Sequence, residues 1–441
     1  MTSSHNASRD ATHWRRTFWT LWSGQLVSLL GSGITQFALA VWAFQRSGSA
    51  TQFGAIAMCS VLPGLVFSPL AGVFVDRWNR RTAMLIANVG AAAATAAAAA
   101  LLAVGRIEPW HICVATSLVS GFAALHWPAY VATTTVLVPK EQLGRANGAA
   151  MVTDAVAELA APVLGGVLLA ALGLVGVFAL DLCTFVFATV TLLGVRVPPV
   201  PRGPTAATAA TAPASVGREL VEAWRYLAAR PGLVGLLALS CITSLAIGFL
   251  EVLSAPVVLS VASPAVLGAV RSVAGAGMLA GSIAMNLWGG PRRRVAGVIG
   301  FQLVLGAQLV IMGFPTAPWL LAAAGFGALF SLPLVNGCGQ TLWQTKLALH
   351  MQGRMFALRR LARVFRPLGY VAAGYLADRL AGPMLAGGSL APLVGRLIGV
   401  GPGRGSALLL VIIGLVTIVA TLVVSRYRPL REVEHEIPDA H

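Results

Sequence analysis

Four acidic residues lie in stretches of the chain that otherwise carry almost no charge. Asp154 and Glu158 are four residues apart, so on a helix they share one face, while Asp181 and Glu251 stand alone further along. A carboxyl held in an apolar environment favours its protonated form, so it can take up a proton on one side of a membrane and release it on the other. We therefore predict that Glu158, and after it Asp154, exchanges protons. The alternative is that both acids only satisfy polar groups in a water-filled vestibule.

Arg271 is a basic residue inside an apolar stretch, assigned to neither an inner segment nor an outer loop. Glu251 lies seven residues before the expected outer end of one apolar segment, and Arg271 lies seven residues after the start of the next. At 1.5 Å per residue, both are roughly 10 Å deep. An unpaired arginine at that depth is costly. We predict an ion pair between Glu251 and Arg271, either structural or part of an outer gate, with Asp181 at similar depth as a competing partner.

These groups are conspicuous because the chain as a whole is so apolar. It has 441 residues, of which 57% are hydrophobic and only 10% are charged, whereas soluble proteins carry about 25% charged residues. Apolar runs of about 20 residues, the length that crosses a bilayer, recur along the chain. The five cysteines lie in these runs without a Cys-x-x-Cys pair, which favours packing over redox or metal chemistry. The sequence thus predicts an all-α membrane protein.

Charged or turn-rich breaks divide the chain into twelve predicted spans. With the N-terminus inside, 25 of the 31 Lys and Arg residues fall on inner segments and five on outer loops, so we expect both termini to be cytosolic and the protein to be multi-pass in the inner (plasma) membrane. The net charge of +16 is spread over short loops, which indicates anionic lipids on the cytosolic face as the partner and no nucleic acid. The spans are expected at 17–44, 50–74, 82–105, 110–137, 146–171, 174–195, 232–258, 264–288, 295–314, 318–343, 362–381 and 406–425.

The spans form two groups of six. We expect a cytosolic tail at 1–16, a six-helix bundle at 17–195, a second bundle at 232–425 and a cytosolic tail at 426–441. Residues 196–231 form a Pro-, Ala- and Thr-rich cytosolic linker that ends in an amphipathic helix.

The loop after the second span combines a glycine, an acid and several arginines at fixed spacing. The pattern is Gly72-x-x-x-Asp76-Arg77-x-x-Arg80-Arg81. The positive-inside rule accounts for the arginines but not for the glycine or the acid. This loop resembles the signature motif of the major facilitator superfamily, which implies two pseudo-symmetric six-helix bundles. The resemblance also implies that Gly72 packs the second span against the eleventh, and that Asp76 and the arginines Arg77, Arg80 and Arg81 form a conformational latch.

Two other segments are related to this motif. The matching loop of the second half, residues 289–294, keeps three arginines but lacks the acid. Gly374-x-x-x-Asp378-Arg379 has the same letters, but it falls at the expected outer end of the eleventh span, so it is set aside as a gate.

The fifth span carries small residues at helical spacing around a proline. They resemble the antiporter motif of exporters in the superfamily, with alanines at two glycine positions. Small residues allow close helix contact, and a proline bends the helix. The alternative is a general packing face. The motif residues are Gly148, Ala157, Ala161, Pro162, Gly165 and Gly166.

Longer segments are similar to the macrolide-efflux branch of the superfamily. They are residues 24–53, 127–148, 401–405 and 431–439. The resemblance implies proton-driven export of bulky hydrophobic or amphipathic molecules. Amide and aromatic groups suit a shape-tolerant cavity for such ligands. The candidates for this cavity are Gln25, Gln36, Phe37, Trp42 and His126.

The chain carries no signature of catalysis. There is no GxxxxGK[ST], His-Glu-x-x-His or Gly-x-Ser-x-Gly pattern. We expect no enzyme activity, no cofactor and no metal, a monomeric state, and transport driven by an ion gradient. Two alternatives remain, namely an importer or uniporter of a polar solute and a non-transporting membrane sensor on the same fold.

Overall fold

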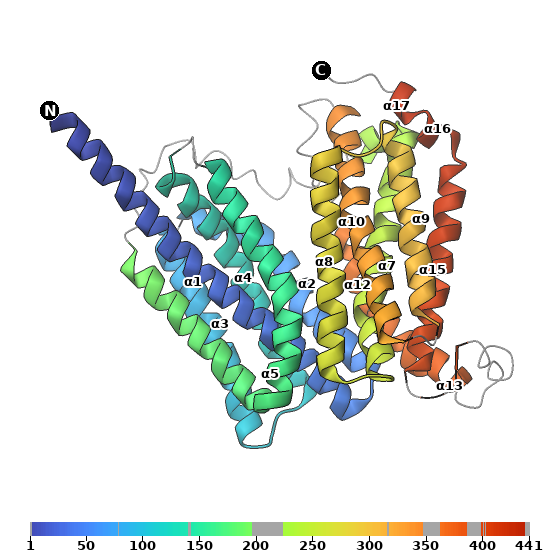
Figure 1. Ribbon diagram of the computed structural model, residues 1–441, viewed down its shortest axis with the longest axis horizontal. Coiled ribbons are helices and arrows are strands. Elements are labelled where there is room, and N and C mark those ends of the chain that lie inside the picture. The colour runs from blue at the N-terminus through green and yellow to red at the C-terminus, as the bar shows by residue number, and fades with distance from the viewer. Residues whose placement is uncertain are drawn as a thin grey trace. The chain divides into compact units, whose positions relative to one another are not determined.

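The computed structural model describes residues 2–77, 79–139, 143–195, 224–314, 317–346, 362–385, 398–399, 401 and 403–436. Within these ranges the regular structure is helical (Figure 1). The long helices of the first half are α1 (Thr2–Ser47), α2 (Ala50–Arg77), α3 (Arg80–Ala103), α4 (Pro109–Leu137) and α5 (Leu143–Gly194). Those of the second half are α7 (Pro231–Leu259), α8 (Pro264–Trp288), α9 (Arg294–Met312), α10 (Pro318–Lys346), α12 (Phe365–Leu376) and α15 (Arg404–Ser425). The short elements are η3 (Ala362–Val364), η4 (Ala377–Ala381), α13 (Gly382–Leu385), α16 (Arg428–Arg431) and α17 (Val433–Glu436).

The described residues include ten helices that are long and apolar enough to cross a membrane. One of them, α5, contains both predicted spans 5 and 6. Gly173 lies between the two spans and breaks the helix with a φ of 65° and a ψ of −179°. Only glycine adopts such a conformation readily, so the turn between these two spans depends on this residue. Predicted span 11 falls on η3, α12 and η4, where the backbone changes to a π-helix at Ala377. The chain is therefore a multi-pass integral membrane protein.

Two compact units make up the structure. The first comprises Met1–Arg46 and Ile56–Ala207, and the second comprises Ser47–Ala55 and Thr208–His441. The first residues of α2 thus pack with the second unit, although the rest of that helix belongs to the first. The bundle, linker and tail boundaries expected from the sequence stay predictions.

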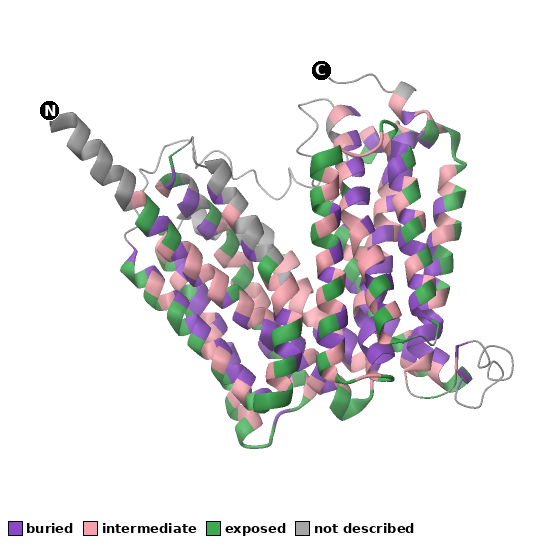
Figure 2. Ribbon diagram, in the orientation of Figure 1, coloured by how far each residue is buried: buried purple, intermediate pink, exposed green. Residues whose placement is uncertain are grey.

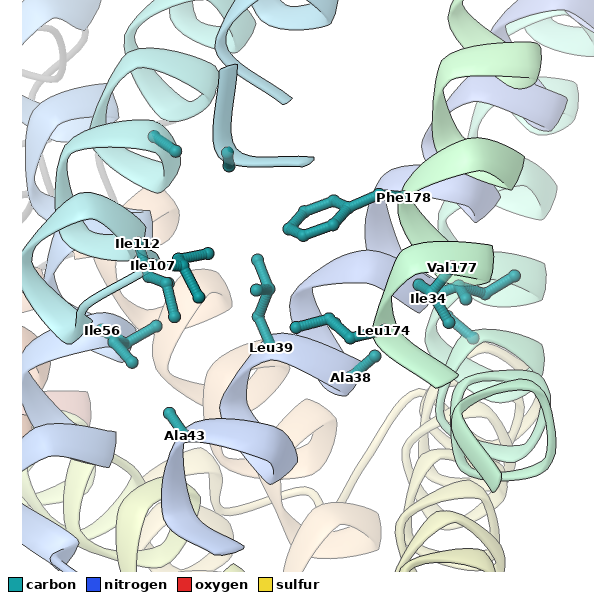
Figure 3. Packing of buried hydrophobic residues seen from close by; sticks show 13 residues of the cluster. Ile34, Ala38, Leu39, Ala43, Ile56, Ile107, Ile112, Leu174, Val177 and Phe178 are labelled. Atoms are coloured by element: carbon teal, nitrogen blue, oxygen red, sulfur yellow. The ribbon is translucent and has the colours of Figure 1, made fainter. Parts of the chain in front are cut away.

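In the first unit, α3 packs against α4 and α5. A cluster of buried apolar side chains joins α1 to the second half of α5 (Figure 3). Ile34, Ala38 and Leu39 come from α1, and Leu174 and Phe178 come from α5. Because these side chains are buried together, they fix which faces of the two helices meet.

In the second unit, α10 packs against α8 and α9, and α15 packs against α9 and α7. A second buried cluster includes Trp343 of α10 and Leu430 and Val433 of the C-terminal segment. Glu434 lies next to this cluster, where its carboxylate accepts hydrogen bonds from the backbone N–H groups of Arg294 (2.6 Å) and Val295 (3.3 Å) at the start of α9. The C-terminal segment is thereby held on the second unit by both apolar burial and helix capping.

The outer faces of the helices are apolar, as a lipid environment requires. On α15, Thr417 and Thr421 are fully buried, whereas Val416, Val419 and Val423 are exposed. The same alternation of buried and exposed turns is visible along other long helices (Figure 2). Each of these two buried threonines donates to the backbone carbonyl four residues earlier, so its hydroxyl hydrogen is satisfied within the helix.

Candidate functional site

The predicted gate loop lies between the end of α2 and the start of α3. Gly72, Asp76 and Arg77 belong to α2, but their side chains lie outside the part of the structure that is described. Arg80 is the first residue of α3. Arg81 donates to the backbone carbonyls of Leu192 (Nε, 3.3 Å) and Leu193 (Nη2, 2.5 Å), at the end of α5. A cation at a helix C-terminus stabilises it, so this arginine has a structural role within the first unit. The latch role of the loop stays a prediction.

The small-residue motif of the fifth span faces α1. Ala161 and Gly165 are buried. A Cβ added to Gly165 would lie 2.8 Å from Cδ1 of Phe37 and 3.2 Å from the carbonyl oxygen of Ile34, and one added to Gly33 would lie 2.9 Å from Cβ of Ala161. The two helices therefore touch over this face, and only small residues permit that approach.

The other motif positions are part of the same helix. Ala157 is half-buried, Gly166 is buried, and Pro162 lies inside the helix. Gly148 belongs to α5 as well, but its surroundings are outside the described part.

The candidate cavity residues have different surroundings. Phe37 is used in the contact with Gly165. Gln36 is exposed, and its Nε2 donates to Oγ of Ser60 (2.8 Å). Trp42 lies under the guanidinium of Arg46, 5.3 Å from ring centroid to Cζ. Gln25 and His126 each have a buried Nε2 for which the described residues offer no hydrogen-bond partner.

The second unit surrounds Glu251 with cationic and hydroxyl donors from two helices. Nε of Arg366 donates to one carboxylate oxygen (2.9 Å), Nη2 donates to the other, and the Tyr370 hydroxyl donates to the first oxygen as well. Arg271 lies beside this group and donates through Nη2 to the backbone carbonyl of Glu251 (2.7 Å) and to Oγ of Ser254 (3.2 Å). Glu251 and Arg271 are therefore neighbours, but Arg366 holds the carboxylate in the two-pronged geometry that arginine favours.

Arg366 was missed by the sequence analysis, which does not single it out although it lies near the start of the predicted span 362–381. In the structure it is the second residue of α12, and its partner Glu251 lies eight residues before the end of α7. The sequence did contain one signal for this pair, because an acid at membrane depth such as Glu251 needs a cation nearby.

Asp181 has no cationic partner among the described residues. It is 2% exposed, and its neighbours are hydroxyl groups of the first unit. Ser32 Oγ of α1 donates to Oδ1 at 3.3 Å, and Thr184 Oγ1 lies 3.5 Å from the same oxygen. Among the described residues, Asp181 therefore has hydroxyl groups as its neighbours and not the arginine that the sequence analysis considered as a partner.

Asp378 of η4 places its side chain against the start of α2. Its carboxylate accepts hydrogen bonds from Ser49 Oγ (2.6 Å), the Ala50 N–H (3.0 Å) and the Thr51 N–H (2.8 Å). A Cβ on Gly374 would lie 2.6 Å from the Ala50 carbonyl oxygen, so the glycine permits the approach. The Gly-x-x-x-Asp-Arg pattern that the sequence analysis set aside thus caps a helix N-terminus, where a negative charge is stabilised.

The predicted proton-exchange residues, Glu158 and Asp154, lie on the first half of α5, but their side chains are outside the described part of the structure. Among the described residues, no group of three or more His, Cys, Asp and Glu side chains is placed to hold a metal ion.

Multiple apolar helices and acids at membrane depth define a polytopic membrane protein of the transporter class. The chain belongs to the Major Facilitator Superfamily, whose family model matches residues 21–367. Members of this family are transporters and not enzymes.

Curated relatives include two efflux proteins. Macrolide efflux protein A of Streptococcus pyogenes is 26% identical over 83% of this chain and 91% of that protein. Multidrug efflux pump Tap of Mycolicibacterium fortuitum is 27% identical over 83% of this chain and 93% of that protein.

Solved structures share the fold. An inward-facing, unoccupied bacterial homolog of the human lysosomal transporter Spinster has a TM-score of 0.69 at 15% identity, over 94% of this chain and 97% of that one. An inward-facing bacterial homologue of the iron transporter ferroportin has a TM-score of 0.65 at 15% identity, over 93% and 99%.

Proposed function

We propose that this chain is a secondary active exporter of bulky hydrophobic or amphipathic compounds, such as macrolides or peptide antibiotics, and that it works by alternating access in exchange for protons. The observation that carries the proposal is the close contact between the small-residue face of α5, at Ala161 and Gly165, and α1. This face belongs to the motif that separates exporters from importers in the resemblance described above. The names of the two curated relatives, both efflux proteins, support the same direction of transport.

The substrate path in this proposal runs beside α1 and α4. Gln36 is exposed, and Gln25 and His126 each have a nitrogen for which the described part of the chain offers no hydrogen-bond partner. Such groups can meet the few polar atoms of a large apolar ligand, while Trp42 offers an aromatic surface. Phe37, which is packed against Gly165, would act through helix packing instead.

The loop from Gly72 to Arg81 is the latch in this scheme. Asp76 and the arginines Arg77, Arg80 and Arg81 would close the cytosolic side. Asp378 caps the start of α2 through three hydrogen bonds that lie within the second unit.

The proposal includes a setting in the inner membrane. Both termini are cytosolic, the protein is a monomer, and anionic lipids contact the basic cytosolic segments. The two six-helix bundles, 17–195 and 232–425, rock about a central cavity, and the linker 196–231 joins them. Glu158 and Asp154 remain candidates for proton exchange.

Everted membrane vesicles test the function. With a pH gradient imposed, we expect vesicles containing the wild-type protein to accumulate erythromycin, a macrolide, or bacitracin, a peptide antibiotic, and to lose the accumulation when the gradient is collapsed. Vesicles without the protein are the control. Equal accumulation with and without the protein would exclude an exporter of these compounds.

The same assay addresses the parts of the mechanism. Asp76→Asn is expected to slow transport because it weakens the cytosolic latch, and Glu158→Gln is expected to abolish accumulation if this residue carries protons. Gly165→Leu is expected to stop transport because the added side chain would collide with Phe37 and the carbonyl of Ile34. An importer of a polar solute would instead move solute out of everted vesicles, and a sensor would move none.

A further inference from the structure

The carboxyl of Asp181 lies in a small polar site inside the first unit. Ser32 and Thr35 come from α1, Thr95 comes from α3, and Thr184 comes from the second half of α5. The three threonines are at most 9% exposed. The site begins one helical turn after Phe178 of the apolar cluster in Figure 3, so the hydroxyl groups are shielded by packed side chains.

No cation among the described residues reaches this carboxyl. On the packed helices the described basic residues lie at the ends. Arg81 contacts the carbonyls of Leu192 and Leu193, eleven and twelve residues beyond Asp181, and Arg46 lies eleven residues beyond Thr35. Each is therefore roughly 16 Å away along its helix. The other described charged or titratable residues on α1, α3, α4 and α5 have no recorded hydrogen bond to Asp181; they are Arg15, Arg16, Arg80, His111, Cys113, His126, Tyr130 and Cys183.

The two remaining acids of α5 lie on its other half. Asp154 and Glu158 precede the Gly173 break, and their side chains are not described. Glu158 is fifteen residues before Gly173 and Asp181 is eight residues after it, so their depths differ by roughly 10 Å at 1.5 Å per residue. The two residues therefore lie at different depths on the chain.

The burial of this carboxyl, and not its hydrogen bonds, favours the neutral form. Ser32 Oγ donates to Oδ1 at 3.3 Å, and Thr184 Oγ1, whose shorter hydrogen bond goes to the backbone carbonyl of Asp181 at 2.7 Å, lies 3.5 Å from the same oxygen. A hydroxyl group both donates and accepts, so these groups can serve the carboxylate and, after rotation, accept a hydrogen bond from the protonated acid. A lone ionised carboxylate in this dry, low-dielectric position would be costly.

We propose that Asp181 is a proton-binding site of the transporter and that it takes up and releases one proton in each transport cycle. Its burial without a cation favours the protonated form, and the hydroxyl groups of Ser32, Thr35, Thr95 and Thr184 can bond either form. The inference deepens the proposed function and rests on it for the coupling step. In that step, a proton adds to the carboxylate to give the neutral acid, and opening of the contact between α1 and α5 admits water that accepts the proton again.

Infrared spectroscopy tests the protonation without any drug. We expect the spectrum of wild-type protein minus that of Asp181→Asn, both in lipid at neutral pH, to contain the carbonyl band of a protonated carboxyl. Carboxylate bands in that difference spectrum would overturn the proposal. The measurement does not depend on transport, so it stands even if the export function fails.

Transport by purified protein in liposomes tests the coupling. We expect Asp181→Asn to lose at least tenfold of the pH-gradient-driven erythromycin accumulation but to keep erythromycin exchange without a gradient. Asp181→Glu should restore part of the coupling. Thr191→Val is the matched control, because it removes a hydroxyl from the same helix that donates only to the carbonyl of Ala188.

Two outcomes would overturn the inference. One is wild-type accumulation by Asp181→Asn. The other is replacement of the pH gradient by a sodium gradient, which would make the same oxygens a sodium site. If wild-type protein moves no erythromycin, the proposed function fails, while the infrared result still decides whether Asp181 binds a proton. If Asp181→Asn does not fold, Thr35→Val is used, and it is expected to weaken pH-driven accumulation more than Thr191→Val does.

Discussion

The first and second units each contain an acid at membrane depth, and the surroundings of the two acids differ. Asp181 is 2% exposed and meets only hydroxyl groups among its described neighbours. The Glu251 side chain is 32% exposed and meets Arg366, Tyr370 and the nearby Arg271. Cations stabilise the charged form of a carboxyl, whereas burial among neutral groups stabilises the uncharged form.

This difference in surroundings indicates different roles for Asp181 and Glu251, which look alike in the sequence. A carboxylate bound by a two-pronged arginine is held in place, and exchanging its proton would break the ion pair. A carboxyl surrounded by hydroxyls can gain or lose a proton with little rearrangement. In the second unit Asp378 adds an intermediate case, since backbone N–H groups and a hydroxyl stabilise its charge without any cation.

The largest effect on stability is expected in the Glu251 site. Arg366→Leu leaves the carboxylate without its main partner, and the loss of a fully buried partner costs about 3–5 kcal/mol. Because the Arg366 side chain is 46% exposed, we expect a decrease of about 1–3 kcal/mol in the free energy of unfolding after discounting for screening. Thermal unfolding in detergent measures it.

Arg363→Leu is the matched control for this variant, because Arg363 is an exposed arginine three residues earlier. Adding Glu251→Gln to Arg366→Leu should recover part of the loss, since no charge is then left without a partner. If both arginine variants unfold at the same temperature, the Glu251 site is not a stabilising ion pair, and the contrast between the units fails.

A smaller effect is expected at the start of α2. Asp378→Ala removes three hydrogen bonds to Ser49, Ala50 and Thr51, and the loss of a helix N-cap costs about 1–2 kcal/mol. We expect faster hydrogen exchange of the amides of residues 50–52. Arg379→Ala, at the exposed neighbouring position, should leave their exchange unchanged. Equal exchange rates in the two variants would mean that Asp378 does not hold this turn.

The smallest effect on stability is expected at Asp181. Asp181→Asn replaces a neutral carboxyl by a neutral amide of similar shape, so the free energy of unfolding should change by about 1 kcal/mol or less. Its thermal unfolding is compared with that of Thr191→Val. A decrease in the free energy of unfolding as large as that of Arg366→Leu would indicate that Asp181 is an ionised group with a partner. The two acids would then have the same kind of surroundings.

The sequence located the residues with chemistry better than it located their partners. Lone acids in apolar runs mark Asp181 and Glu251, and small residues at helical spacing mark the face of α5 at Ala161 and Gly165. Arg366 could not be assigned to Glu251 from its position, because 115 residues separate them and only helix packing brings α12 to α7. The Gly374–Asp378 pattern was set aside for a related reason, since its partner at 49–51 lies more than 300 residues away.

By itself the sequence determined that the chain is a helical membrane protein with acids at membrane depth, because hydrophobicity and the cost of a lone charge in lipid depend only on residue type and run length. Only the tertiary structure decided which of those acids lies beside arginine, which caps a helix and which is enclosed by hydroxyl groups. Whether a carboxyl prefers to be charged depends on the few atoms around it, and those atoms come from other helices.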